Sequence, residues 1–465
     1  MKHVSLLFLY AYITVLLFYQ PVLFTYFSQD DFFHFKVSQT DGSLTGFLNL
    51  FGAHSFQERG IAFYRPISRE FLYHTFYNLF GLNPIPFRLL QLTLLAVNMT
   101  LVYLLMQKIF SAKTLSILTA FFFGITASNV APLFYLAGGA QTLIATSFIL
   151  LCLILYLEFL KSKIKIYYFA SFITYIFALA SHELSASLPI ILLLLSFSLV
   201  SKKQYLHEAV RLLPFFIILS LYLYIDIHII GFSDQEKQYQ LSVGVKTFMN
   251  SLSWYFVWGL GIPEMLIDFV FPGFKLNPDL MKYWGNYFRI IFSAFFIVLA
   301  TIAFSLTYLL WTKKALLFDK KFLFLLFWFP IAIFPVTFLP LHKSSYYLVP
   351  ALPALWGGVW YLIFNTYRSI KLKHQRAANL FFVISFLSFL ILSFTSIKLG
   401  ETTYWAATRG KLAEKLVKEV KFAYPILPKG ALIYFVNDPS YPYVAQDWGG
   451  TSKQAAFALN GEDAL

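Results

Sequence analysis

The sequence predicts an all-α membrane protein that crosses the bilayer many times. Of its 465 residues, 59% are hydrophobic and only 12% are charged, whereas soluble domains carry about 25% charged residues. Apolar runs of about 20 residues, the helix length that crosses about 30 Å of hydrocarbon, recur along the whole chain. A soluble protein could bury a few such runs, but not this many.

Eleven apolar segments form the expected spans: residues 4–24, 87–107, 115–135, 142–160, 166–181, 186–200, 211–231, 288–311, 322–340, 346–365 and 379–397. Clusters of Lys and Arg follow alternate spans, as Lys161, Lys163 and Lys165 follow the fourth. Such cationic loops remain on the cytoplasmic side. We therefore expect a multi-pass protein of the cell membrane with a cytoplasmic N-terminus and an extracytoplasmic C-terminus, which requires an odd number of spans.

The region 244–286 does not fit this pattern simply. Phe248–Gly261 is apolar enough to enter the bilayer, but Pro263, Glu264 and Asp268 interrupt the segment. An odd number of spans is kept if the region lies at the outer interface or re-enters the membrane, where non-helical backbone must be buried or line water. Thirteen spans are the alternative.

The net charge of +14 does not indicate nucleic-acid binding, because most cations lie in short loops between apolar runs. The single cysteine, Cys152, excludes an intrachain disulfide and a multi-cysteine metal site. No small-residue cleavage site follows the first apolar run, Val4–Phe24, so we expect it to stay in the protein as a span.

The expected organisation is a transmembrane module, residues 1–397, followed by a small extracytoplasmic α/β segment, residues 398–465. The module carries a long first outer loop, residues 25–86. In the tail, Gly410–Tyr424 has helical spacing, and Ala431–Val436 is typical of a short strand between turn residues.

The first candidate site residues are the adjacent carboxylates Asp30 and Asp31, directly after the first span. Two carboxylates at a membrane surface repel one another and lose solvation, so a compensating partner is expected. The structural alternative is a solvated helix cap, for which Asp is well suited.

The second group, Tyr64-Arg65-Pro66 with Arg69, lies in the same outer loop. An arginine presents a planar fork of donors suited to phosphate or carboxylate. The structural alternative is a cation at a helix end whose charged head extends to the interface.

Two further groups lie beside later spans. His182 and Glu183 fall in a connection too short to be an ordinary aqueous loop, where ionisable groups are costly and usually paired or functional. His342, Lys343 and Tyr346 offer a cation and hydroxyl donors between the last spans, although a simple aromatic belt is the alternative. Asp226 in the seventh span is an additional intramembrane acid to which we assign no direct role.

The expected topology places these groups on one side of the membrane. The residues on the outer leaflet side are Asp30, Asp31, Arg65, His182, Glu183, His342 and Lys343. Carboxylates and cations gathered there suit a substrate with a lipid-anchored phosphate.

The order of these motifs resembles the GT-C superfamily of polyprenyl-phosphate-sugar-dependent glycosyltransferases, nearest the protein O-mannosyltransferases and their bacterial relatives. Four segments carry the resemblance, over residues 1–200 and more loosely 330–465: Asp30-Asp31, Tyr64-Arg65-Pro66, Ser181-His182-Glu183-Leu184-Ser185 with Leu188-Pro189, and Ser345-Tyr346-Tyr347-Leu348-Val349-Pro350.

The resemblance implies inverting transfer of a sugar from a polyprenyl-phosphate donor to a hydroxyl of a glycan, lipid or protein. Asp30 would be the general base, with Asp31 beside it in the catalytic pair. The residues expected to bind substrate and its phosphate are Tyr64, Arg65, Arg69, His182, Glu183, His342, Lys343 and Tyr346. A divalent metal could also bind, although the spacing does not establish a site. Two alternatives stay open: a transporter or flippase of lipid-linked sugars, and a polymerase or ligase that uses a polyprenyl-diphosphate donor.

Overall fold

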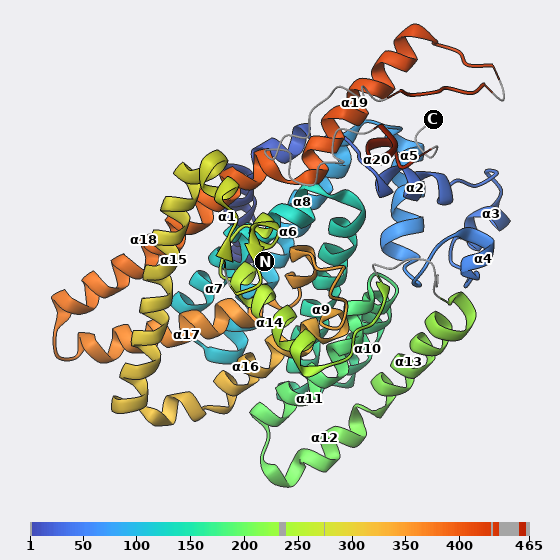
Figure 1. Ribbon diagram of the computed structural model, residues 1–465. Coiled ribbons are helices and arrows are strands. Elements are labelled where there is room, and N and C mark those ends of the chain that lie inside the picture. The colour runs from blue at the N-terminus through green and yellow to red at the C-terminus, as the bar shows by residue number, and fades with distance from the viewer. Residues whose placement is uncertain (1, 232–238, 274, 429–430, 437–454, 462–465) are drawn as a thin grey trace.

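The computed structural model describes residues 2–231, 239–273, 275–428, 431–436 and 455–461. Apart from one two-residue pair of strands, the regular elements in these ranges are helices and helical turns (Figure 1). This confirms the expected all-α membrane class.

The α-helices are α1 (Lys2–Tyr19), α2 (Asp30–Val37), α3 (Leu44–Asn49), α4 (Phe56–Arg59), α5 (Leu72–Phe80), α6 (Pro84–Phe110), α7 (Lys113–Ile125), α8 (Val130–Phe134), α9 (Leu136–Ser162), α10 (Lys165–Leu179), α11 (Leu188–Leu199), α12 (Tyr205–Arg211), α13 (Leu213–Tyr224), α14 (Val245–Gly259), α15 (Pro278–Thr312), α16 (Lys320–Ile333), α17 (Leu352–Lys371), α18 (Gln375–Thr403), α19 (Trp405–Ala423) and α20 (Ala455–Leu459). The 3-10 and π segments used below are η1 (Gln20–Phe24), η2 (Ile67–Phe71), η3 (Ala127–Asn129), η4 (Glu183–Ser187), η6 (Ile225–Ile230), η8 (Glu264–Phe269) and η11 (Ser345–Leu348).

Within the described residues, six helical segments are long and apolar enough to cross a membrane: Val4–Phe24, Pro84–Phe110, Leu136–Ser162, Leu213–Ile230, Pro278–Thr312 and Gln375–Ala423. A seventh is formed if Lys113–Ile125 and Ala127–Phe134, which meet at a bend of 45°, are one span. By length and composition, this part of the chain therefore holds six or seven spans rather than the expected eleven.

The other four expected spans are helical, but they do not meet the same criteria. The helices α10, α11 and α16 have 15, 12 and 14 residues, fewer than the about 20 that cross the hydrocarbon. The helix α17 has 20 residues but ends in a polar stretch that includes Asn365 and Arg368. Hydropathy over a window cannot distinguish a full crossing from a shorter apolar helix packed inside the bundle, which explains the difference.

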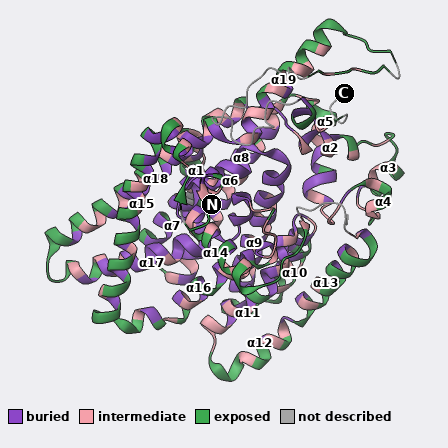
Figure 2. Ribbon diagram, viewed as in Figure 1, coloured by how far each residue is buried: buried purple, intermediate pink, exposed green. Residues whose placement is uncertain are grey.

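The bundle has a buried interior and an exposed outside (Figure 2). The side chains of Trp258, Trp328, Trp356 and Trp360 are all fully buried. On the outside, large apolar side chains are exposed along helices such as α13 and α15. Continuous apolar exposure is unusual for a soluble protein and is expected of a surface in contact with lipid.

The region 244–286 contains α14, η8, a hairpin of β1 (Val270–Phe271) and β2 (Lys275–Leu276), and the start of α15. The helix α14 has 15 residues and ends before Pro263, so it is shorter than a full crossing. The two additional spans of the thirteen-helix alternative are not present in this region as described.

The tail differs from the expectation. The predicted helix is present as α19, but the predicted strand Ala431–Val436 has no regular secondary structure. Its side chains Leu432 and Tyr434 are 99% and 90% exposed, and none of the described segments pairs with it as a strand. A short β-prone segment needs a partner and an apolar surface to cover before it forms a stable strand. Residues 437–454 lie outside the described residues.

Gly139 allows the short helix α8 to pack against the start of α9, and this contact can be tested. A Cβ atom at residue 139 would lie 1.9 Å from the backbone oxygen of Pro132. We predict that Gly139→Ala lowers stability by about 1–3 kcal/mol through overpacking, measured as a lower apparent Tm in detergent. The control is Gly358→Ala in α17, where the nearest atom lies 4.0 Å away and which should be neutral or stabilising. Equal Tm values for the two variants would contradict the close contact.

Candidate functional site

A cavity of about 410 Å³ lies where segments far apart in the sequence meet. Its lining residues are Gln29, Asp30, Phe33, His34, Phe56, Gly60, Ile61, Ala62, Phe63, Arg65, Arg69, Tyr135, Ala137, Gly138, Tyr239, His342, Tyr346, Tyr347 and Asn460. They come from the start of α2, the outer loop before α5, the α8–α9 junction, the segment before α14, the segment around η11 and the end of α20. The volume is in the range of about 300–1,000 Å³ found for small-molecule sites.

The structure brings half of the predicted site residues to this cavity. Those that line it are Asp30, Arg65, Arg69, His342 and Tyr346. Those that do not line it are Asp31, Tyr64, His182, Glu183 and Lys343. The four predicted motifs therefore meet around one space, but only some of their side chains face it.

The two adjacent carboxylates have different surroundings. Asp30 lines the cavity and accepts a hydrogen bond from the hydroxyl of Tyr135. Asp31 is fully buried and accepts hydrogen bonds from the backbone N–H of Ser28 (2.9 Å) and Ala137 (2.8 Å) and from the Tyr73 hydroxyl (3.2 Å). Asp31 thus joins the start of α2 to the start of α9 and faces away from the space that a substrate would occupy.

Burial also sets the protonation of Asp31. It raises the pKa of this carboxyl to about 6, although the nearby Arg88 cation acts in the opposite direction. The predicted catalytic role of Asp31 has no support from its position, which is structural.

Arg65 and Glu183 form the principal ion pair of the site. The Nε of Arg65 lies 2.8 Å from Oε2 of Glu183, and Nη2 lies 2.6 Å from Oε1. The remaining nitrogen, Nη1, donates to Oε1 of Gln141 at 2.6 Å. Burial alone would raise the pKa of Glu183, but the Arg65 cation and its hydrogen bonds lower this pKa to about 2. The two-point pairing holds the guanidinium in one orientation at the cavity wall.

His182 lies behind this pair. Its Nδ1 accepts a hydrogen bond from the N–H of Leu184 at 3.3 Å. Burial lowers the pKa of His182 to about 3, although Glu183 acts in the opposite direction. The predicted substrate- or phosphate-binding role of His182 has no support from its position, because the side chain is buried and does not line the cavity.

Tyr64 holds the backbone beside Arg65. Its N–H donates to Oδ1 of Asp226 at 2.8 Å, and its hydroxyl donates to the carbonyl oxygen of Phe51 at 2.7 Å. Asp226 belongs to the π segment η6, so this intramembrane acid anchors the outer loop to the end of the seventh expected span. The sequence showed the unusual acid but not its partner.

Arg69 braces the same loop. Its guanidinium pairs with Glu70 at 2.8 Å and donates to the carbonyl oxygens of Ala62 (2.9 Å) and Phe63 (2.8 Å). These bonds fix the cavity wall in which Phe63 adopts a positive φ of 66°. Arg69 therefore touches the cavity while much of its donor capacity holds the wall.

The segment around η11 forms the opposite wall. The Tyr346 hydroxyl lies 3.3 Å from Nε2 of His342, and the His342 and Tyr239 rings are 4.8 Å apart. Burial and the Arg65 charge lower the pKa of His342 to about 4, so it is a neutral donor or acceptor at pH 7. Lys343 instead donates to Asn250 at 3.0 Å, outside the cavity.

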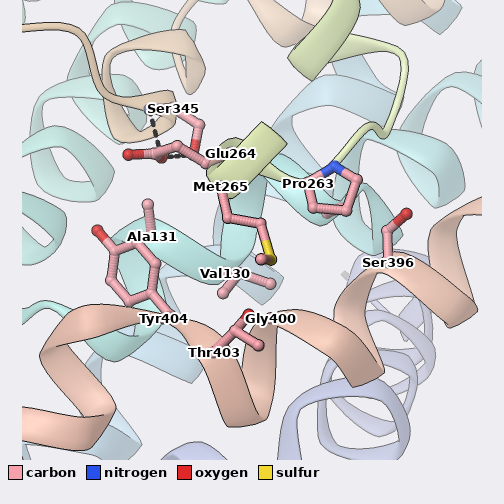
Figure 3. A pocket seen from close by; sticks show the side chains of 11 residues that line it. Val130, Ala131, Pro263, Glu264, Met265, Ser345, Ser396, Gly400, Thr403 and Tyr404 are labelled. Carbon is pink, nitrogen blue, oxygen red and sulfur yellow. Dashed lines mark hydrogen bonds between the residues drawn. The ribbon is translucent and has the colours of Figure 1, made fainter. Parts of the chain in front are cut away.

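Glu264 holds the segment around η11 through Ser344 and Ser345, and Figure 3 shows its contact with Ser345. Its carboxylate accepts from the Ser345 N–H (2.8 Å), the Ser345 hydroxyl (2.5 Å) and the Ser344 hydroxyl (3.1 Å). Burial raises the pKa of Glu264 to about 7 despite these donors. Beside it is a separate space of about 20 Å³ that Ser396 and Tyr404 help to line, enough for about one water molecule. Glu264 thus supports the wall and does not line the larger cavity.

Sequence reasoning missed several residues of the site. His34, Tyr135 and Tyr347 line the cavity, and Gln141 and Glu264 hold its walls. The spacing of His34 four residues after Asp30 in a helix could have shown that both share one face. For the others, the contacts join distant segments and leave no local pattern in the sequence.

The described residues contain no group of three or more His, Cys, Asp and Glu side chains that could hold a metal ion. The metal site considered from the sequence therefore has no ligand set here, and we derive no step through a metal.

Comparison with models of known protein families gave no match for this chain. A search of curated proteins likewise gave no match.

The structural role assigned to Asp31 can be tested through the pH dependence of protein stability. Because the pKa of Asp31 in the folded protein, about 6, lies above its ordinary value of 3.8, folding favours the protonated carboxyl. Its contribution to stability is therefore fully present below pH 4 and is lost as the pH rises through 6, by about 3 kcal/mol for two pKa units. Relative to Asp31→Asn, which stays neutral, wild type should lose stability between pH 4 and 7 in thermal denaturation. Parallel pH curves for the two proteins would contradict this assignment.

Proposed function

We propose that this chain is a membrane glycosyltransferase that moves a sugar from a polyprenyl-phosphate donor to an acceptor hydroxyl. The observation that carries the proposal is one cavity lined by Asp30, by Arg65, which Glu183 holds from outside the lining, and by a wall of aromatic rings. A carboxylate can accept the acceptor proton, a guanidinium can stabilise a phosphate, and aromatic faces can stack against a sugar.

The proposed topology has all eleven apolar segments within the membrane and the cavity on the extracytoplasmic side. In support, the cationic loops meet one another away from the cavity. The Lys161 ammonium donates to the carbonyl oxygen of Lys108 at 2.9 Å, and that of Lys320 donates to the carbonyl oxygen of Val200 at 3.4 Å. This gathering matches a cytoplasmic face, and the proposed topology has the N-terminus on that side.

In the proposed reaction, Asp30 takes the proton of the acceptor hydroxyl as the acceptor oxygen bonds to the anomeric carbon. The bond between that carbon and the phosphate oxygen breaks, and its electron pair leaves with the polyprenyl phosphate. Because the leaving group is a stable anion, no proton donor is required. One displacement inverts the configuration at the anomeric carbon.

Tyr135 and Arg65 have separate roles in this scheme. The Tyr135 hydroxyl, which donates to Asp30, fixes the carboxylate at the cavity wall. Arg65 uses three N–H donors on Glu183 and Gln141, and a guanidinium has five. The remaining donors stabilise the charge that develops on the phosphate. The acceptor is a glycan, lipid or protein hydroxyl.

The decisive test is donor turnover by Asp30→Asn. Purified protein in lipid is supplied with a panel of polyprenyl-phosphate sugars, and release of polyprenyl phosphate is followed with and without acceptors. Loss of general-base catalysis should reduce release by about 10²–10⁴-fold, with Tm unchanged. Asp41→Asn, an exposed carboxylate in the same outer loop, is the matched control and should retain full release.

The same assay separates the alternatives. Wild-type rates in Asp30→Asn would overturn the role of Asp30. With polyprenyl-diphosphate sugars added to the panel, release of polyprenyl diphosphate from these donors alone would indicate the polymerase or ligase reaction. Movement of an intact lipid-linked sugar across the vesicle, without release, would indicate a transporter.

A further inference from the structure

The residue immediately before Asp30 has an unusual backbone. Gln29 has φ 50° and ψ −120°, and the N–H of Asp31 donates to the carbonyl oxygen of Ser28 at 3.2 Å. This is the geometry of a type II′ turn with Gln29 at the first central position, which glycine normally occupies. A non-glycine residue in such a conformation persists only where surrounding contacts hold it, and these positions gather at functional sites.

The backbone N–H and the side-chain amide of Gln29 both form hydrogen bonds with the C-terminal region. Its N–H donates to the carbonyl oxygen of Ala458 at 3.0 Å, and its side-chain Oε1 accepts a hydrogen bond from Nη1 of Arg409. Arg409 also interacts electrostatically with Asp30. The strained turn that presents Asp30 is therefore held by α19 and α20, which follow the last expected span.

Aromatic rings fix the Arg409 side chain. Its guanidinium carbon lies 4.7 Å from the ring centre of Trp405 and 5.5 Å from that of Phe457. The Trp405 ring in turn lies 4.9 Å from the ring of Tyr135, whose hydroxyl binds Asp30. Cation–π contacts of this kind hold a guanidinium in place without neutralising it.

The short helix α20 is docked onto the outer loop. Figure 1 shows it beside α2 and α5, although it lies at the other end of the sequence. Ala458 and Leu459 are 0% and 1% exposed and belong to one buried cluster with Phe27 and Phe32. Asn460, directly after the helix, lines the cavity. This segment is a wall of the site and not an independent appendage.

We propose that the C-terminal region, through Arg409 and residues 455–461, is a positioning element for Asp30. It holds Gln29 in the strained turn and keeps a cation beside the carboxylate. The inference rests on the proposed function, because it assigns to Asp30 the role of base. It also has a purely structural component, the docking of α20, that can be tested without any reaction.

The docking test uses the fact that the only cysteine of the chain, Cys152, is buried. A cysteine placed at buried Leu459 should react slowly with a maleimide, whereas one placed at exposed Ala456 on the same helix should react quickly. Adding Arg409→Ala should accelerate labelling of Leu459→Cys at least tenfold and leave Ala456→Cys unchanged. Equal rates at the two positions in otherwise native chains, confirmed with Ala458→Cys, would overturn the docking.

The positioning test compares turnover in Arg409→Gln, Arg409→Lys and Lys411→Gln, the last an exposed residue of the same helix. We expect Arg409→Gln to lower kcat at least tenfold with KM for the donor within twofold, because the Arg65 side of the cavity is unchanged. Arg409→Lys should restore part of kcat, and Lys411→Gln should equal wild type. Gln29→Gly suits the turn but removes the side-chain acceptor. In this background, Arg409→Gln should lower kcat by a smaller factor than it does in wild type.

The pH profile separates positioning from a general loss of structure. Among the groups that interact with Asp30 are Asp31, Tyr73, Tyr135 and Arg409, and Arg409 is a cation whose removal favours protonation of the carboxylate. The acid limb of the rate profile should therefore move to higher pH in Arg409→Gln and stay in place in Arg409→Lys. An unchanged kcat and acid limb in Arg409→Gln would overturn the inference. If wild type itself turns over no donor, the proposed function fails, while the labelling result still decides whether α20 docks.

Discussion

The cavity depends on the ion pair between Arg65 and Glu183. Arg65 belongs to the first outer loop, whereas Glu183 begins the turn between α10 and α11. Neither charge could stay at the edge of an apolar bundle alone, because an unpaired charge there loses its hydration without compensation. Pairing joins the loop to the helices, and Asp226, through the backbone of Tyr64, secures the same loop from a third element. The wall is therefore fixed by the need to satisfy buried charge.

The same requirement explains why adjacent carboxylates differ. Asp31 uses its oxygens on two backbone N–H groups and a phenol and becomes part of the framework. Asp30, one position earlier in α2, lies at the cavity with a phenol and a nearby guanidinium. A helix turns about 100° per residue, so a helical start separates the two side chains into different surroundings. One carboxylate builds the site and the other is available to it.

The membrane class and the grouping of motifs could be predicted from the sequence, because hydropathy, charge placement and ionisable residues in apolar surroundings are local signals. The predicted residues that line the cavity are Asp30, Arg65, Arg69, His342 and Tyr346. The number of helices long enough to cross the membrane could not be predicted from the sequence, because apolar windows do not reveal that α10, α11 and α16 are short. The supports Glu264 and Arg409 were also missed as such. Arg409 and Gln29 are 380 positions apart, and no spacing rule connects residues so distant.

The charge balance of the cavity bears on the choice among donors. Of the cations that line it, Arg65 is paired with Glu183 and Arg69 with Glu70, while His342 is held neutral by burial. The lining therefore supplies directed N–H donors rather than a large excess of positive charge. A polyprenyl-phosphate sugar carries one negative charge at its phosphodiester, which such donors can accommodate. A diphosphate donor brings a second charge, which directed donors alone offset less well. This charge balance supports the proposed transfer from a monophosphate donor.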